Sequence, residues 1–415
     1  MLYALHEFQH AALAPWNHLA RTSLELFSNP FSPLAYLPTS RRVAAGAELF
    51  HRLTQRYEKP AFGLEHTVID GRTIRVQEHI AVEKPFCNLV RFERLFGESK
   101  TGKAKRRQPD PKLLLVAPLS GHFATLLRDT VRTLLPDHDV YITDWADARM
   151  VPLEKGPFHL DDYIDYVREF IRFLGPDMHV MSVCQPTVPV LAAVSLMASA
   201  DEPVKPKTMV MMGGPIDARK SPTAVNNLAM EKPYSWFERS VIQRVPIRYP
   251  GYMRRVYPGF IQHMGFVAMN PSRHADAHWE FYNHLVAGDG ESADSHRQFY
   301  DEYNAVLDMP AEYYLETIKC VFQEFLLPRG RFFARDQLVR PQDIRSTALL
   351  TVEGELDDIS GNGQTSAAHT LCTGIPDKRR EHYEVPGAGH YGIFSGRRWR
   401  ENVYPRVRDF IRSHA

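Results

Sequence analysis

The chain has 415 residues, 44% of them hydrophobic and 24% charged, and this composition excludes an intrinsically disordered protein. Its 50 basic and 49 acidic residues leave a formal net charge of +1, which excludes a general electrostatic attraction to nucleic acid or to an anionic membrane. The cysteines, Cys87, Cys184, Cys320 and Cys372, are too few for a disulfide scaffold and too widely spaced for a zinc ribbon, so a reducing cytosol is expected.

Targeting and membrane-spanning segments are not expected. The stretch Met1–Arg21 has no basic n-region, and His6, Glu7 and His10 interrupt the apolar core that a signal peptide requires. The longest weakly polar stretch, Pro186–Ala200, contains an internal proline and falls short of the roughly 20 apolar residues of a membrane span. We therefore predict a soluble, cytoplasmic protein that recognises its partners locally and does not bind nucleic acid.

Residues 1–112 are expected to form a region that leads into a central sheet. Helical spacing is found at 2–27 and 41–57, and Asp70-Gly71 between two β-rich runs predicts a hairpin. A connecting loop is expected after the hairpin. It ends in a linker, Ser99–Lys112, in which basic residues mix with glycine and proline.

From residue 113 onwards, strand and helix patterns alternate, which indicates a parallel sheet. Strands are predicted at 113–119, 139–143, 178–183 and 207–212, and helices at 123–135, 161–174 and from 187. The alternation stops at 216–345 and resumes with a strand at 347–352, a helix, a strand at 383–385 and a last helix from 397. We therefore predict a mostly parallel sheet with helices on both faces, built from 113–215 and 346–415, with a largely helical cap inserted at 216–345.

The segment Ser182-Val183-Cys184-Gln185-Pro186 combines the end of a strand, a turn and the start of a helix. It resembles the nucleophile elbow G-x-S-x-G, with cysteine in place of serine and without either flanking glycine. A thiol at a helix N-terminus is favoured as thiolate by the helix dipole. Taken alone, Cys184 fits equally well as a small buried hydrophobic residue.

Two more segments with catalytic residue types follow predicted strands. Asp357 and Asp358 come after the strand at 347–352, and His390 comes after the strand at 383–385. The chain order of nucleophile, acid and histidine is that of α/β-hydrolases. We predict this fold, with Cys184 as nucleophile, His390 as base and Asp357 as the residue that orients the imidazole; Asp358 is the alternative acid.

An oxyanion hole is expected next to these residues. The backbone N–H after the nucleophile belongs to Gln185, and a second donor is expected in the loop after the strand at 113–119. Pro118 has no N–H, so Leu119 or Ser120 is the predicted second donor.

One motif points to another class of enzyme. His6-Glu7-Phe8-Gln9-His10 matches the zinc-protease pattern H-E-x-x-H, but it precedes any sheet that could form a cleft, and no third ligand is evident. His274 and His278 share a helix face in the cap, where packing or solvation is the simpler interpretation. We predict neither a metal site nor a bound cofactor.

Segments spread over almost the whole chain resemble the intracellular polyhydroxybutyrate depolymerases. They are Ala117-Pro118-Leu119-Ser120-Gly121-His122, Ser182-Val183-Cys184-Gln185-Pro186-Thr187, Met212-Gly213-Gly214-Pro215-Ile216-Asp217, Gly265-Phe266-Val267-Ala268-Met269-Asn270-Pro271, Glu353-Gly354-Glu355-Leu356-Asp357-Asp358-Ile359-Ser360 and His390-Tyr391-Gly392-Ile393-Phe394-Ser395-Gly396. The resemblance implies a cytoplasmic thiol hydrolase that cuts amorphous storage polyester on granules and releases 3-hydroxybutyrate or short oligomers. It places the catalytic triad at Cys184, Asp357 and His390.

The cap is rich in large apolar side chains, which suit a trough for a water-insoluble chain or a surface that rests on a granule. About two thirds of them are expected to be buried packing. They are Trp236, Phe237, Tyr249, Tyr252, Tyr257, Phe260, Met264 and Phe266.

Two alternatives to a depolymerase stay open. A polyester synthase-like acyltransferase would be expected to have glycines around its cysteine, G-x-C-x-G, where this chain has Ser182 and Pro186. A non-catalytic granule-coating protein would not need all three residues of the triad. The acyl acceptor, water or a cellular thiol, and the oligomeric state are not determined by the sequence.

Overall fold

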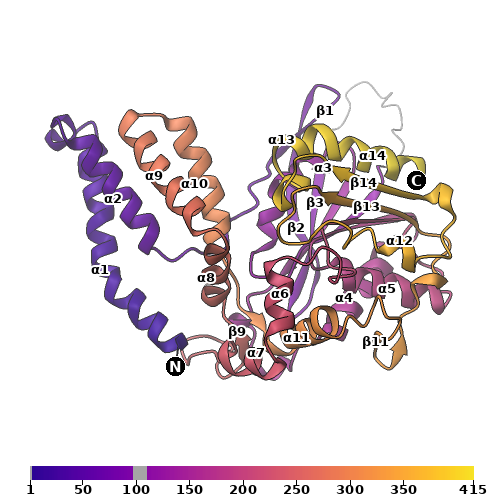
Figure 1. Ribbon diagram of the computed structural model, residues 1–415. Helices are drawn as coiled ribbons and strands as arrows, with labels where there is room; N and C mark the ends of the chain where they lie inside the picture. The colour runs from indigo at the N-terminus through magenta and orange to yellow at the C-terminus, as the bar shows by residue number, and fades with distance from the viewer. Residues whose placement is uncertain (1, 97–109) are drawn as a thin grey trace.

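The centre of the molecule is a nine-stranded sheet, seen in a computed structural model that describes residues 2–96 and 110–415 (Figure 1). In sheet order, the strands are β1 (His66–Ile69), β2 (Arg72–Glu83), β3 (Cys87–Leu95), β5 (Asp139–Trp145), β4 (Lys112–Val116), β6 (Met178–Val183), β7 (Thr208–Met212), β13 (Ala348–Gly354) and β14 (Arg380–Val385). From β5 to β14 all neighbours are parallel, and β1 to β3 are antiparallel. The prediction of a mostly parallel sheet is confirmed.

The hairpin at Asp70-Gly71 is also confirmed. Both turn residues have positive φ, 50° and 73°, as a two-residue hairpin turn requires. The loop predicted after the hairpin is partly wrong, because β3 follows it and pairs with β2 and β5. The hairpin therefore belongs to the main sheet. Most of the predicted linker, residues 97–109, lies outside the described part of the chain.

Helices cover both faces of the sheet, as predicted (Figure 1). α3 (Arg128–Leu134) and α14 (Tyr404–Ser413) lie on one face, and α4 (Leu160–Leu174) and α5 (Thr187–Ser199) lie on the other. α4 buries a stripe of residues at helical spacing, whereas α5 is apolar on all sides and is buried from Thr187 to Met197. The short helices α12 (Ala368–Leu371) and α13 (Gly396–Arg398) complete this part of the chain.

The cap between β7 and β13 is largely helical, with a small three-stranded sheet. Its helices are α6 (Ala224–Glu231), α7 (Tyr234–Ser240), α8 (Gly259–Met269), α9 (Pro271–Ala287), α10 (Gly290–Asn304) and α11 (Ala311–Thr317). Its strands are β8 (Gln243–Arg244), β9 (Arg255–Tyr257), β10 (Met309–Pro310) and the pair β11 (Phe333–Ala334) and β12 (Gln337–Leu338).

The large apolar residues of the cap are less buried than predicted. Of the eight, Phe237 is fully buried, Tyr252 and Met264 are exposed, and the other five are half-buried. Three of the eight lie on α8, whose buried residues are Gly259 and Gln262. This helix therefore leaves most of its apolar surface partly open.

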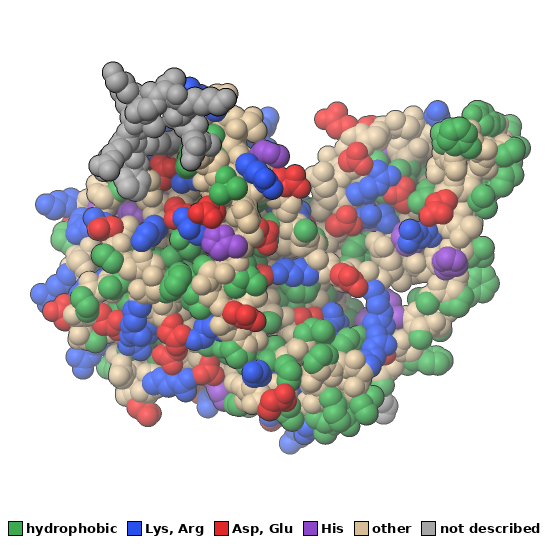
Figure 2. All heavy atoms as spheres, turned by 180° about the vertical axis from the view of Figure 1, so that it is seen from behind, with side chains coloured by type: hydrophobic (Ala, Val, Ile, Leu, Met, Phe, Trp, Pro, Cys, Tyr) green, Lys and Arg blue, Asp and Glu red, His purple; other side chains and the backbone are tan. Residues whose placement is uncertain are grey.

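The N-terminal helices α1 (Leu2–Ser28) and α2 (Ser40–Thr54) pack with α9 and α10 into a helical lobe beside the sheet (Figure 1). Arg297 pairs with Glu48, and Arg52 pairs with Asp301, each at 2.6 Å, and these contacts join the two pairs of helices. α1 exposes Leu5, Phe8, Trp16 and Leu19, and apolar side chains are visible along the outer edge of the lobe in Figure 2. No described helix is both long and apolar enough to cross a membrane.

Candidate active site

Cys184 occupies the sharp turn between β6 and α5. Its φ of 68° is in the left-handed region, which a residue other than glycine rarely adopts. The backbone N–H of Cys184 donates to Met212 O at 2.7 Å, and its carbonyl accepts from Thr187 N at 3.1 Å. Backbone strain of this kind, held by the surrounding structure, characterises a nucleophile elbow.

The close packing of this turn explains how it forms without its two flanking glycines. A Cβ on Gly214, just after β7, would lie 2.5 Å from the carbonyl oxygen of Cys184 and would also collide with Thr187. Thr365 holds Gly214 in place, accepting from its N–H at 2.8 Å and donating to its carbonyl at 3.0 Å. Gly214, which follows the neighbouring strand β7, therefore provides the space that the two flanking glycines provide in the motif G-x-S-x-G.

His390 and Asp357 meet in the interior at the ends of β14 and β13. His390 Nδ1 lies 2.7 Å from Asp357 Oδ2, and both side chains are buried. Asp357 Oδ1 accepts the backbone N–H groups of Ile359 at 2.9 Å and Ser360 at 2.8 Å. Asp358, the alternative acid in the sequence, is exposed. The predicted acid that contacts the histidine is therefore Asp357.

The charge state of His390 depends on both predicted partners. Burial opposes charging of the imidazole, but interactions with Cys184 and Asp357 hold the pKa of His390 well above its ordinary value. Cys184 itself is partly exposed, whereas His390 is enclosed. The structure thus brings Cys184, His390 and Asp357 together in one site.

Gly213 was not singled out by the sequence as a site residue, yet it lies against the predicted acid and base. Its φ is 56°, and a Cβ there would lie 3.2 Å from His390 Cε1, 3.4 Å from Asp357 Oδ2 and 2.8 Å from Ile393 Cδ1. In the sequence, the feature that could have indicated Gly213 is the pair of glycines, Gly213-Gly214, at the end of a buried strand.

The predicted oxyanion donors have free backbone N–H groups. Within the described residues, no hydrogen bond uses the N–H of Gln185, Leu119 or Ser120. The loop is fixed just before Pro118, because Ala117 O accepts from Trp145 Nε1 at 2.8 Å and from Tyr163 Oη at 3.1 Å.

The cap covers the end of the same loop. Gly121 has a φ of 110°, and a Cβ on it would lie 2.8 Å from Gln262 Oε1 and 3.1 Å from the ring of Phe266. Phe266 also stacks on His122 with ring centroids 4.9 Å apart. α8, which carries Gln262 and Phe266, therefore packs against the loop that contains the predicted oxyanion donors.

The residues of the zinc-like motif serve as packing and ion-pair partners. His6 stacks on Phe260 with ring centroids 4.1 Å apart, and burial lowers its pKa to about 4. Glu7 pairs with Arg56 and Arg248, each at 2.6 Å. No group of three or more histidine, cysteine, aspartate or glutamate residues in the described ranges has an arrangement that could hold a metal ion.

In the cap, His274 bonds two tyrosines. Its Nδ1 lies 2.9 Å from the hydroxyl of Tyr300 and its Nε2 lies 3.2 Å from that of Tyr303. Both ring nitrogens therefore form hydrogen bonds within the helical lobe, and neither is left to bind a metal ion. His278 packs against Tyr300 instead, with ring centroids 4.4 Å apart and the ring planes tilted by 36°.

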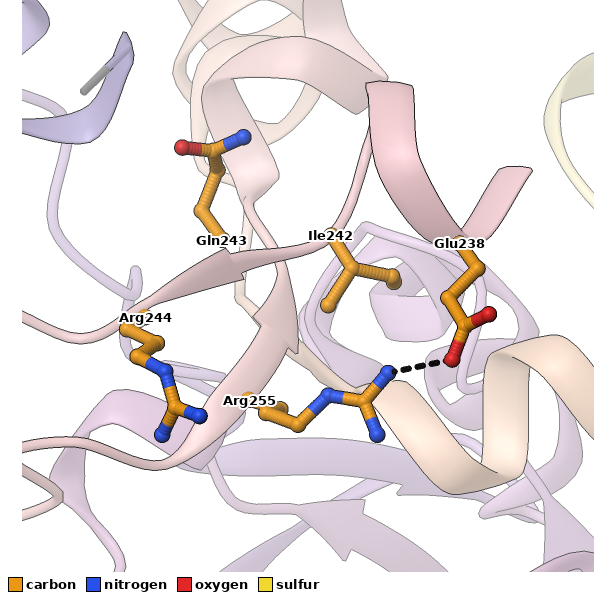
Figure 3. A pocket seen from close by; sticks show the side chains of 5 residues that line it. All are labelled: Glu238, Ile242, Gln243, Arg244 and Arg255. Atoms are coloured by element: carbon orange, nitrogen blue, oxygen red, sulfur yellow. Dashed lines mark hydrogen bonds and ion pairs between the residues drawn. The ribbon is translucent and has the colours of Figure 1, made fainter. Parts of the chain in front are cut away.

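A surface hollow in the cap contains none of the predicted site residues (Figure 3). Arg255 reaches across it to Glu238 at 3.1 Å, and Arg244 bonds the backbone of Met253. The guanidinium groups of Arg255 and Arg244 are therefore both bound to other groups of the protein.

The strand order, the strained cysteine turn and the acid and histidine at the ends of the next strands define an α/β-hydrolase.

Solved structures similar to the chain include a monoacylglycerol lipase of Paleococcus ferrophilus, with 13% identity, a TM-score of 0.41, and 74% of this chain and 97% of that one covered. A thermophilic esterase from Thermogutta terrifontis has 13% identity and a TM-score of 0.41, covering 85% and 98%. The 2-hydroxy-6-oxo-6-phenylhexa-2,4-dienoate hydrolase of Rhodococcus sp. strain RHA1 has 12% identity and a TM-score of 0.44, covering 82% and 99%.

Residues 213–415 match the family model described as PHB de-polymerase C-terminus. The predicted resemblance to the polyhydroxybutyrate depolymerases is therefore confirmed over this part of the chain. The family description supports ester hydrolysis as the type of reaction. No curated protein matches the chain.

Proposed function

We propose that the protein is an intracellular depolymerase that hydrolyses the ester bonds of amorphous polyhydroxybutyrate and releases 3-hydroxybutyrate or short oligomers. The family match over residues 213–415 supports the substrate class. The observation that carries the mechanism is the buried contact between His390 and Asp357 next to Cys184 in its strained turn.

In the proposed reaction, the Cys184 sulfur attacks the ester carbonyl carbon while His390 holds the thiol proton. The negative charge on the tetrahedral oxygen is stabilised by the N–H of Gln185 and that of Leu119 or Ser120. The intermediate collapses to a thioester on Cys184, and His390 returns the proton to the leaving alkoxide. His390 then takes a proton from water, whose oxygen attacks the thioester and releases the acid and the free thiol.

The proposed setting is the surface of a storage granule in the cytoplasm. The exposed apolar side chains of α1 and the half-buried ones of α8 offer surfaces for a water-insoluble polyester. The formal charge of +1 does not favour an anionic partner. A cellular thiol is the alternative acyl acceptor, and it would attack the same thioester in place of water.

Two other functions use the same fold. A synthase-like acyltransferase is disfavoured because Ser182 and Pro186 replace the glycines expected around its cysteine. A granule-coating protein without activity is disfavoured because the three predicted catalytic residues lie together.

The deciding experiment incubates the protein with amorphous polyhydroxybutyrate, with and without coenzyme A, and identifies the products by mass spectrometry. We expect free 3-hydroxybutyrate or oligomers without coenzyme A. Products that need coenzyme A would indicate transfer to a thiol, and absence of any product would indicate a coating protein. Crystalline polymer serves as the comparison, because a mobile chain enters a narrow site more readily than one held in a lattice.

A further inference from the structure

Three buried side chains near Cys184 carry polar atoms that no described residue pairs. They are Thr187 at the start of α5, through its Oγ1, Tyr313, through its hydroxyl, and Gln185, through both atoms of its side-chain amide. Tyr313 and Gln185 come from opposite sides of the site, the cap and the elbow. Tyr313 is 1% exposed and Gln185 is 8% exposed, so water does not satisfy these atoms freely. An unpaired buried polar group costs about 1–3 kcal/mol, and most buried polar groups in folded proteins have a hydrogen-bond partner.

Tyr313 is held rigidly between the cap and the core. Its ring stacks on Tyr163 with centroids 5.5 Å apart, and Tyr163 stacks on Trp145 at 4.1 Å. Trp145 and Tyr163 both bond Ala117 O at the start of the oxyanion loop. This stack of three rings therefore connects the predicted oxyanion loop to Tyr313 on α11.

The hydroxyl of Tyr313 faces the nucleophile end of the site. Burial, and next the proximity of Cys184, raise the pKa of Tyr313 well above its ordinary value. Gln185 and Thr317 interact with the hydroxyl and oppose this rise, although neither meets it with hydrogen-bond geometry. A neutral hydroxyl donates a hydrogen bond, and the neighbouring amide both donates and accepts.

We propose that the Tyr313 hydroxyl and the Gln185 side-chain amide form the subsite that binds the oxygen on the third carbon of the acyl unit. This inference rests on the proposed function, because it takes the acyl group on Cys184 to be a 3-hydroxyacyl unit or its ester. Such a unit has two polar positions near the sulfur. The proposed backbone donors bind the carbonyl oxygen. The side chains of Tyr313 and Gln185 are therefore available to bind the oxygen on the third carbon.

The subsite makes Tyr313 a specificity-determining residue. A plain acyl chain would leave the hydroxyl and the amide unpaired in the complex, whereas a 3-oxygenated chain would satisfy both. Sites built to hydrogen-bond a substrate oxygen discriminate strongly against the analogue that lacks it. The wild-type protein should therefore prefer 3-oxygenated esters to plain ones of the same length.

The test compares p-nitrophenyl 3-hydroxybutyrate with p-nitrophenyl butyrate. The measured quantity is the ratio of their kcat/KM values, which should favour the 3-hydroxy ester in the wild-type protein. In Tyr313→Phe this ratio should fall about five- to tenfold, the size of one neutral hydrogen bond. The control is Tyr314→Phe, the next residue on α11, whose ring packs on Tyr257 at 4.3 Å; it should keep the wild-type ratio.

Thermal unfolding separates this role from a structural one. Because no described residue meets the Tyr313 hydroxyl with hydrogen-bond geometry, Tyr313→Phe should keep or raise Tm, whereas loss of a structural hydrogen bond would lower it. Equal losses on both esters, an unchanged ratio, or a wild-type protein without preference would each overturn the subsite. A wild-type protein inactive on both esters and on the polymer would instead overturn the proposed function, and the subsite with it.

Discussion

Asp357 holds His390 through one carboxylate oxygen while its other oxygen is held by the backbone of its own loop. The Asp357 Oδ2 to His390 Nδ1 distance is 2.7 Å, and Oδ1 accepts two N–H groups, from Ile359 and Ser360. The carboxylate is thereby prevented from rotating. In the proposed mechanism, this fixed carboxylate would keep the proton on Nδ1 of His390 and leave Nε2 to exchange a proton with Cys184.

The matched pair Asp357→Asn and Asp358→Asn tests this relationship. Asp357→Asn should lower kcat about 100-fold or more, because an amide can present its N–H to the ring and favour the wrong tautomer. Asp358→Asn should retain wild-type activity, since Asp358 is exposed. Steady-state kinetics on a soluble ester measures both. Equal effects of the two substitutions would contradict the assignment of the acid.

Removal of the proposed nucleophile should abolish turnover without unfolding the protein. Cys184→Ala should lower kcat at least about 1,000-fold, because binding and oxyanion contributions alone remain. The control is Cys320→Ala, which removes a thiol from the cap and should leave the activity in place. Near wild-type turnover by Cys184→Ala, with a normal circular dichroism spectrum, would rule out the thioester mechanism.

Chemical labelling should distinguish Cys184 from the other cysteines. Burial raises the pKa of Cys320 to about 11 and that of Cys372 to about 12, and it raises that of Cys87 well above its ordinary value. A raised thiol pKa lowers the thiolate fraction at neutral pH, and iodoacetamide reacts with thiolate. We expect mass mapping to find Cys184 alkylated first. Earlier labelling of Cys87, Cys320 or Cys372 would argue against an activated thiol at Cys184.

The elements that carry the site could be predicted because each leaves a local pattern. The buried apolar run of β6 and the all-apolar helix α5 bracket Cys184, and both were predicted with their observed start. β3 was missed because Arg91, Glu93 and Arg94 interrupt its apolar run. The ionic partners of the two arginines, Asp139 and Asp110, lie elsewhere in the sequence.

Contacts between distant segments left no local pattern. Gly213 touches His390 and Asp357 only because β7, β13 and β14 are neighbours in the sheet. Tyr313 reaches Gln185 only because the cap folds back over the elbow. The residue types of the candidate site were thus predictable, while the residues that position them required the structure.

Acid should destabilise the fold through buried and half-buried histidines. Burial is the first cause that lowers the pKa values of His6, His122 and His296, in each case from 6.5 to about 4. Between these pH values the folded chain binds fewer protons than the unfolded one, so the free energy of unfolding falls as the pH falls from 6.5 to 4. Tm should therefore drop across this window.

His296→Phe provides the specific check. The His296 ring stacks on Phe281 with centroids 4.2 Å apart, so phenylalanine keeps the packing and removes the proton-binding nitrogens. The drop in Tm between pH 6.5 and 4 should become smaller in this variant. Exposed His18→Ala serves as the control and should keep the wild-type drop. An unchanged drop in His296→Phe would show that this residue does not contribute to acid sensitivity.

Gly213→Ala should disturb the candidate site without removing any group that takes part in the reaction. An added Cβ would lie 2.8 Å from Ile393 Cδ1 and 3.2 Å from His390 Cε1, and the φ of 56° is unfavourable for alanine. Displacement of the imidazole by a fraction of an ångström weakens its alignment with Cys184, and misplacements near 1 Å cost about 100-fold in rate. We therefore expect kcat on a soluble ester to fall by up to that factor while KM changes little. The control is Gly46→Ala inside α2, where a Cβ meets nothing within 4 Å and helix propensity improves; it should keep wild-type kinetics. A Gly213→Ala variant with wild-type kcat would show that the histidine does not depend on this glycine for its position.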